Sequence, residues 1–313
     1  MSRLTIPFHT GATRRQWGAA ARAARALVLL VLAGIGGVAG PSLAAMAAAP
    51  RVVVDIKPVH ALVAGVMNGI AVPRLLIAGA ASPHDYALRP SDARALAAAD
   101  LVVWVGPALT PSLEKPLGAL AGQARRLTLL DDPAMVARDR AGAIDPHIWL
   151  DPAKAIKIVA DVARALIALD PAHGASYSAN AATLAARLRA LDKELAARLA
   201  PVADVPYAVF HDAFGHLERR YGLSDVGAIA LGPGRAPGAG RLRAIRRAIA
   251  EAGAVCVFAE PQFEPALARI AAAGSGARLA TLDPLGADLP AGPGAYVSLL
   301  RAVAKNLVDC LSS

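Results

Sequence analysis

From residue 50 onward, short apolar runs alternate with longer stretches in which apolar residues recur every three or four positions. The short runs predict buried strands and the three-to-four-residue period predicts helices. Alternating strands and helices are typical of mostly parallel sheets flanked by helices. The predicted strands are 51–56, 74–78, 101–105, 126–130, 207–211, 226–230, 254–259 and 278–282. The predicted helices near them are 60–70, 91–99 (with Ser91 as N-cap), 110–122, 213–221, 240–252, 263–273 and 295–311.

The alternation stops in the middle of the chain. Asp151 and Pro152 suit the N-cap and first turn of a helix, and a second helix is predicted over about 175–200, ~39 Å long at 1.5 Å per residue. Its apolar positions are Tyr177, Leu184, Leu188, Leu191, Leu195 and Leu199. An uninterrupted helix of this length suits a rod between two domains, although it also suits a peripheral helix of one domain. We therefore expect an N-terminal α/β lobe (50–170), a long linker helix (171–203) and a C-terminal α/β lobe (204–313).

The N-terminus has the organisation of a secretory signal. Residues 1–25 carry five arginines and no acid, 26–40 are apolar, and small residues follow up to residue 49. The apolar run is short for a membrane span, which favours a cleaved signal over 1–49 rather than a retained anchor. The Arg14-Arg15 pair leaves twin-arginine export open. Removing the five arginines lowers the formal charge from +9 to about +4, so the high pI does not indicate nucleic-acid binding.

The chain contains two cysteines, Cys256 and Cys310. An even pair in an exported protein predicts a disulfide, here between an inner strand and the C-terminal helix. Two thiolate metal ligands are the alternative, but neither cysteine has a C-x-x-C partner.

Three histidines follow or end predicted strands or their exit loops: His84 in SPHDYALRPSD, His147 in DPHIWLDP and His211 in VFHDAFGHLE. Asp283 in TLDPLG lies in the same kind of position. In open α/β sheets the carboxyl edge is the ligand-binding edge, and three imidazoles with one carboxylate suit Zn2+. We expect His60 and His216 to lie outside this set, because His60 begins a helix and His216 is more than one turn from His211.

At these segments the chain resembles the periplasmic zinc-uptake (ZnuA) family, whose members serve bacterial ABC importers. The matching stretches are DIKPVHALVAGV, ASPHDYALRPSDARALAAADLVVWVGP, HIWLDP, VFHDAFGHLERRYGL, CVFAEPQF and TLDPLG. The resemblance implies two α/β lobes joined by one long helix, with metal bound in the cleft between them. It further implies His84, His147 and His211 as ligands, Asp283 as the fourth, and a disulfide between Cys256 and Cys310.

Two departures from the family pattern stand out. Residues 131–146 contain four aspartates but no histidine, where zinc-uptake members often carry a long loop rich in both. Pro83 stands before His84, where some members have an acidic residue that can reach the metal, so a fifth ligand from that position is excluded.

The expected function is a non-enzymatic, monomeric periplasmic protein that captures Zn2+ for the permease and ATPase subunits of an ABC importer. A manganese- or iron-binding relative and a zinc-dependent hydrolase are the alternatives. A hydrolase would keep an open metal position, and the sequence has neither an H-E-x-x-H motif nor a general base beside the histidines other than Glu260.

Overall fold

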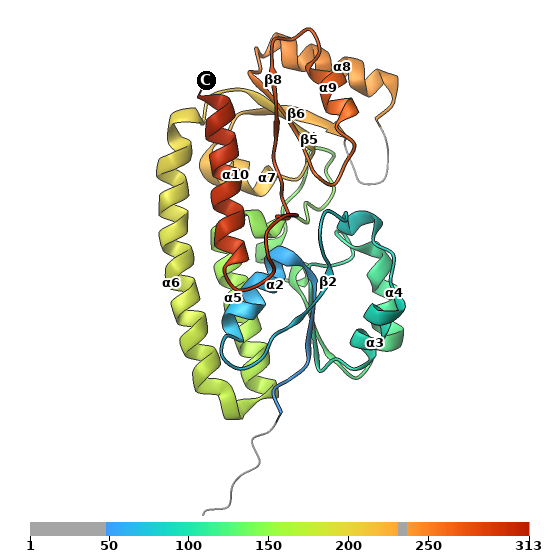
Figure 1. Cartoon of the computed structure of the whole chain (residues 1–313), viewed down its shortest axis with the longest axis vertical. Coiled ribbons are helices and arrows are strands. Elements are labelled where there is room, and N and C mark those ends of the chain that lie inside the picture. Colours follow the sequence, from blue (N-terminus) through green and yellow to red (C-terminus); the bar gives the residue numbers. More distant parts are fainter. Residues whose placement is uncertain (1–47, 231–236, 313) are drawn as a thin grey trace, which may run out of the picture. The chain divides into compact units, whose positions relative to one another are not determined.

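The computed structural model describes residues 48–230 and 237–312, which belong to one compact unit (Figure 1). The predicted signal segment, 1–49, lies outside the described residues except for its last two positions. None of the helices described is long and apolar enough to cross a membrane.

Two four-stranded parallel sheets form the framework, which confirms the predicted fold class. The first has the order β2-β1-β3-β4 and the second the order β6-β5-β7-β8. All residues of β1 are buried, as expected for parallel strands that are covered on both faces. The strands are β1 (Val52–Ile56), β2 (Arg74–Ile77), β3 (Leu101–Trp104), β4 (Arg125–Thr128), β5 (Tyr207–His211), β6 (Asp225–Ala230), β7 (Cys256–Ala259) and β8 (Arg278–Thr281).

Helices connect the strands and cover the sheets. They are α2 (Lys57–Val66), α3 (Pro90–Ala97), α4 (Glu114–Leu120), α5 (Pro152–Leu169), α6 (Gly174–Leu199), α7 (Gly215–Tyr221), α8 (Ala239–Glu251), α9 (Ala266–Ala272) and α10 (Ala295–Leu311). The prediction that Ser91 caps α3 is wrong: the N-cap is Arg89, and Pro90 occupies the first turn, where its fixed φ suits a helix start. Helix α2 also begins earlier than predicted, with Pro58 in its first turn.

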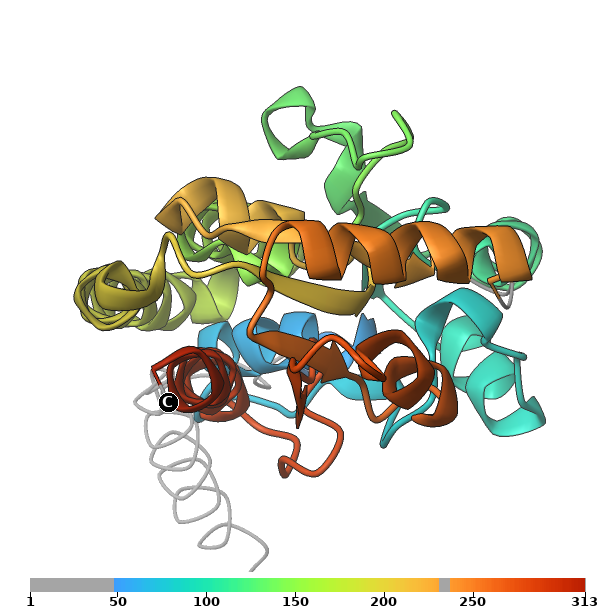
Figure 2. The ribbon, with the colours of Figure 1, turned by 90° about the horizontal axis from the view of Figure 1, so that it is seen from above.

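Helix α6 is the predicted long helix, and it has 26 residues. Its apolar line from Tyr177 to Leu199 is buried as predicted. It packs against α5, α2 and α10, and α6 and α10 run side by side, vertically in Figure 1 and end-on in Figure 2. Helix α10 also packs against α2, so the last helix of the chain contacts the first helix described.

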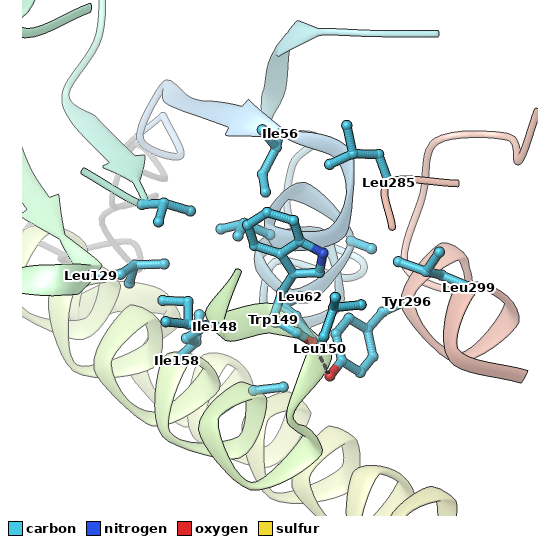
Figure 3. Close-up of a cluster of buried hydrophobic side chains, with 14 of the residues drawn as sticks. Ile56, Leu62, Leu129, Ile148, Trp149, Leu150, Ile158, Leu285, Tyr296 and Leu299 are labelled. Carbon is cyan, nitrogen blue, oxygen red and sulfur yellow. Dashed lines mark hydrogen bonds between the residues drawn. The ribbon is translucent and has the colours of Figure 1, made fainter. Parts of the chain in front are cut away.

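One large hydrophobic core runs through both halves. It contains residues of the first sheet, of α5, α6 and α10, and of the inner strands of the second sheet. Figure 3 shows Trp149 among Leu62, Leu285 and Tyr296, which come from distant parts of the sequence. A smaller core lies between the second sheet and helices α8 and α9. Because the large core is continuous, the lobe boundaries at 170 and 204 stay a prediction.

The predicted disulfide between Cys256 and Cys310 is present, and it joins β7 to α10 across 54 positions of sequence. It fixes the C-terminal helix to the middle of the second sheet.

Candidate metal centre

The strand order places one histidine and one carboxylate side by side. In the second sheet the strand order changes sides at β5: the chain adds β6 on one side of β5 and then crosses to add the parallel strand β7 on the other. Such a switch point is where open α/β sheets bind ligands. Val209 pairs with Phe258, so His211 and Glu260 meet two residues further on, at the carboxyl edge. Glu260 Oε1 accepts hydrogen bonds from the His211 backbone N (3.0 Å) and from Nδ1 (2.7 Å).

His147 has a similar carboxylate partner. It precedes a short 3-10 turn, Ile148–Leu150, and Asp145 Oδ1 accepts hydrogen bonds from its backbone N (3.1 Å) and its Nδ1 (3.0 Å). Arg219 donates to Asp145 Oδ2 at 2.9 Å. Burial alone raises the pKa of Asp145, but hydrogen bonds and the charges of His147 and His216 lower it more, to well below its usual range. The carboxylate is therefore ionised and fixes the ring of His147.

His84 comes from the first sheet. It lies in a 3-10 turn, Pro83–Asp85, that follows β2, and it is half-buried whereas His147 and His211 are buried. Burial, together with the charges of His147 and His211, lowers the pKa of His84 to about 3. Its imidazole is neutral at physiological pH, which is the form that binds metals.

The three rings converge on one point. Each of His84, His147 and His211 offers a ring nitrogen, and these atoms lie within 4.8 Å of one another. The Nε2 atoms of His147 and His211 are 3.3 Å apart. Two nitrogens bound tetrahedrally at ~2.0–2.1 Å from one zinc ion lie ~3.3 Å apart, so this pair already has the spacing of two ligands.

The hydrogen bonds fix which nitrogen of each ring is available. Nδ1 of His147 and Nδ1 of His211 both donate to carboxylates, so in the metal-binding form of each ring the lone pair is on Nε2. Two lone pairs at this distance repel each other unless a proton or a metal cation lies between them. Carboxylate partners that orient metal-binding histidines in this way are common in zinc sites.

A small cavity adjoins the rings. It has space for about one ion or water molecule. Its walls combine the three histidines with the residues Ser82, Pro83, Trp149, Gln262, Phe263, Pro284 and Leu285. The mostly apolar walls lower the local dielectric constant, which strengthens the electrostatic attraction between a cation and its ligands.

Asp283, the predicted fourth ligand, lies after β8 but is not one of the residues that group around the three histidines among the residues described. Its Oδ1 accepts hydrogen bonds from Gln262 Nε2 and Leu285 N, both at 2.9 Å, and its Oδ2 accepts one from Ala287 N at 2.5 Å. Its role as a ligand stays a prediction.

The two histidines that were expected to be bystanders lie outside the cluster. His60 Nε2 bonds the carbonyl oxygen of Pro73 at 3.0 Å, and His216 Nε2 bonds that of Asp145 at 3.1 Å. Both side chains are buried in these contacts.

Sequence reasoning missed Asp145 as the partner of His147, although the D-x-H spacing in IDPHIW was a usable signal. It also missed Arg140, in the His-free loop 131–146. Arg140 forms ion pairs with Asp212 (3.2 Å), Glu218 (3.1 Å) and Asp225. This arginine ties the loop before His147 to the region after His211, and no local sequence pattern indicates it.

Comparison with known proteins decides the family. The model of the family described as zinc-uptake complex component A, periplasmic (ZnuA), matches residues 52–310. The chain belongs to this family. The high-affinity zinc uptake system protein ZnuA of Paracoccus denitrificans is 41% identical over 309 residues, covering 87% of this chain and 95% of that protein. The ZnuA protein of Brucella suis is 39% identical over 305 residues, covering 83% and 91%.

A crystal structure of ZnuA superposes with a TM-score of 0.75 at 27% identity, covering 84% of this chain and 99% of that chain. The ZnuA family is a family of periplasmic binding proteins that work with ABC transporters, and it is not an enzyme class. The chain is thus a zinc-uptake binding protein by family, with a cluster of three histidines where its two sheets meet.

Proposed function

We propose that this protein is exported to the periplasm by a cleaved N-terminal signal, captures Zn2+ and delivers it to the permease and ATPase subunits of an ABC importer. The observation that carries the proposal is the 3.3 Å separation of the Nε2 atoms of His147 and His211, with His84 beside them. The family membership supports the transport role.

His84, His147, His211 and Asp283 are the proposed ligands. The imidazoles of His147 and His211 are already oriented by carboxylates, and His84 needs only a small inward movement because its ring nitrogen lies within 4.8 Å of theirs. Three of the four lone-pair sites of the Asp283 carboxylate accept hydrogen bonds, which leaves one for a metal. Asp283 must turn toward the cavity on binding, so we expect it to contribute less than any histidine.

Zinc is the proposed metal because imidazole ligands suit Zn2+ better than Mn2+, whose sites favour oxygen. In the proposed arrangement His84 and His147 belong to an N-terminal lobe and His211 and Asp283 to a C-terminal lobe. The metal then joins the lobes, and the long helix α6 limits how far they open.

The test is zinc titration by isothermal calorimetry, with chelator competition for tight variants, on the mature protein and on six alanine variants. His→Ala at 84, 147 or 211 should weaken binding sharply and Asp283→Ala should weaken it less. His60→Ala and His216→Ala should bind as the unaltered protein does. A loss at His60 as large as that at His147 would overturn the ligand assignment, and a preference for Mn2+ over Zn2+ would overturn the choice of metal.

A further inference from the structure

The ammonium group of Lys57 is enclosed by three carbonyl oxygens from the far end of the chain. Lys57 begins α2, its side chain is buried, and Nζ donates to the carbonyl oxygens of Gly286 (2.5 Å), Ala287 (2.8 Å) and Leu289 (2.9 Å). An ammonium group has three donors, so all of them are used. A residue directly after the first strand therefore holds a segment that lies 229 to 232 positions later in the sequence.

The segment that Lys57 holds forms a wall of the metal cavity. Residues 283–289 follow β8, and Pro284 and Leu285 line the cavity beside the three histidines. Hydrogen bonds within the segment hold it in a turn, because the carboxylate of Asp283 accepts hydrogen bonds from the backbone N of Leu285 and of Ala287. Ala287 therefore links the carboxylate of Asp283, through its N–H, to the ammonium group of Lys57, through its carbonyl.

A second contact ties the same segment to the residues beside His147. Trp149 Nε1 donates to the carbonyl oxygen of Pro284 at 2.7 Å, and Figure 3 shows Leu285 near the indole of Trp149. Trp149 and Lys57 thus hold the wall at two points, one on each side of Leu285. Gly286, the first of the residues that Lys57 holds, has φ +69°, a backbone conformation that favours glycine.

We propose that Lys57 is a positioning residue of the metal centre, which holds the 283–289 segment against the histidines and thereby slows release of the bound metal. The inference rests on the proposed function and adds a residue that touches no metal. Without the ammonium group, three carbonyl oxygens lose their common donor, and Pro284 and Leu285 are free to move away from the cavity. Water then reaches the metal more easily.

The test is the rate of zinc release into excess chelator, measured by stopped flow on the mature, disulfide-bonded protein. Lys57→Met keeps the length of the side chain and removes its donors, and we expect release to be about 10–100-fold faster, the range typical of residues that support metal ligands. The visible absorption spectrum of the Co2+-loaded protein should change as well. Gly286→Ala disturbs the same segment without altering Lys57, because its Cβ would lie 2.9 Å from Leu289 Cδ1 and the φ is unfavourable, and it should also speed release.

Lys154→Met is the matched control. Lys154 Nζ also donates to a backbone carbonyl, that of Met135 at 2.5 Å, but not to the cavity wall, so release should stay as in the unaltered protein. A merely structural role for Lys57 would lower the melting temperature of the metal-free and zinc-bound forms equally and leave release and the cobalt spectrum unchanged, which would overturn the proposal. If the Lys57→Met variant does not fold, the rate of zinc release from the Gly286→Ala variant tests by itself whether the position of the 283–289 segment controls release. Failure of the unaltered protein to bind zinc would overturn the proposed function and this inference together.

Discussion

Replacing Glu260 by glutamine tests whether the carboxylate partner of His211 contributes to metal binding. Glu260 is 3% exposed, and its Oε1 accepts the Nδ1–H of His211 at 2.7 Å. The negative charge of Glu260 makes the Nε2 atom of His211 a stronger ligand for zinc. Glutamine keeps the shape of the side chain but removes this charge. The amide oxygen of glutamine still accepts the Nδ1–H, so only the charge is lost. A hydrogen bond to a charged group contributes about 1.5–3 kcal/mol and one between neutral groups about 1 kcal/mol, and each 1.4 kcal/mol is tenfold in affinity. We therefore expect zinc binding to weaken about tenfold, the lower end of the range for such partners in other zinc sites.

The assay is competition for zinc between the protein and a chromophoric chelator, together with thermal unfolding with and without zinc. In the metal-free protein the substitution removes a buried charge that no metal balances. The free energy of unfolding of the metal-free form should therefore fall less than that of the zinc-bound form. Glu194→Gln is the matched control, because Glu194 pairs with Arg301 at the surface. If Glu260→Gln and Glu194→Gln both bind zinc as tightly as the unaltered protein, the carboxylate does not act through His211 and the reasoning is wrong.

Three further predictions concern the stability of the fold. Cys310→Ser should lower the free energy of unfolding by about 4 kcal/mol, from the chain entropy of a 54-residue loop, and denaturant unfolding that is unchanged would contradict this. Arg140→Met should destabilise by about 3 kcal/mol at pH 8, because the clustered carboxyl groups of Asp212, Glu218 and Asp225 lose their cation. Burial raises the pKa of Glu218 and of Asp225, so the loss should be smaller at pH 5, and an equal loss at both values refutes it. A histidine in the unfolded chain binds a proton near pH 6.5, whereas His84 in the folded chain does so at about 3. The free energy of unfolding of the metal-free protein should therefore fall as the pH drops from about 6.5 towards 3. In urea unfolding measured at a series of pH values, His84→Ala should make this fall smaller.

Patterns that repeat along the chain predicted most of the fold. The long helix α6 was predictable because its leucines recur at helical spacing, and all of that line is buried. The strands were predictable because parallel strands covered on both faces form continuous apolar runs. The helix starts at Lys57 and Pro90 were not predicted; in both helices a proline occupies the first turn, where its fixed φ suits a helix start.

The clustering of His84, His147 and His211 was predictable, because it depends on residue type and strand position. Contacts across the edge of a sheet, or between the two halves of the molecule, were not predictable from the sequence. Glu260 reaches His211 only because β5 and β7 are neighbours, and Lys57 reaches Gly286 from 229 positions away. Such pairings are set by tertiary packing, which one sequence does not encode in any local pattern.

The most direct test of the central claim is anomalous diffraction at the zinc absorption edge from crystals of the zinc-loaded mature protein. The account predicts one strong peak bonded to ring nitrogens of His84, His147 and His211 at ~2.0–2.1 Å. A peak elsewhere, or one that lacks any of these three imidazoles as a ligand, would contradict it.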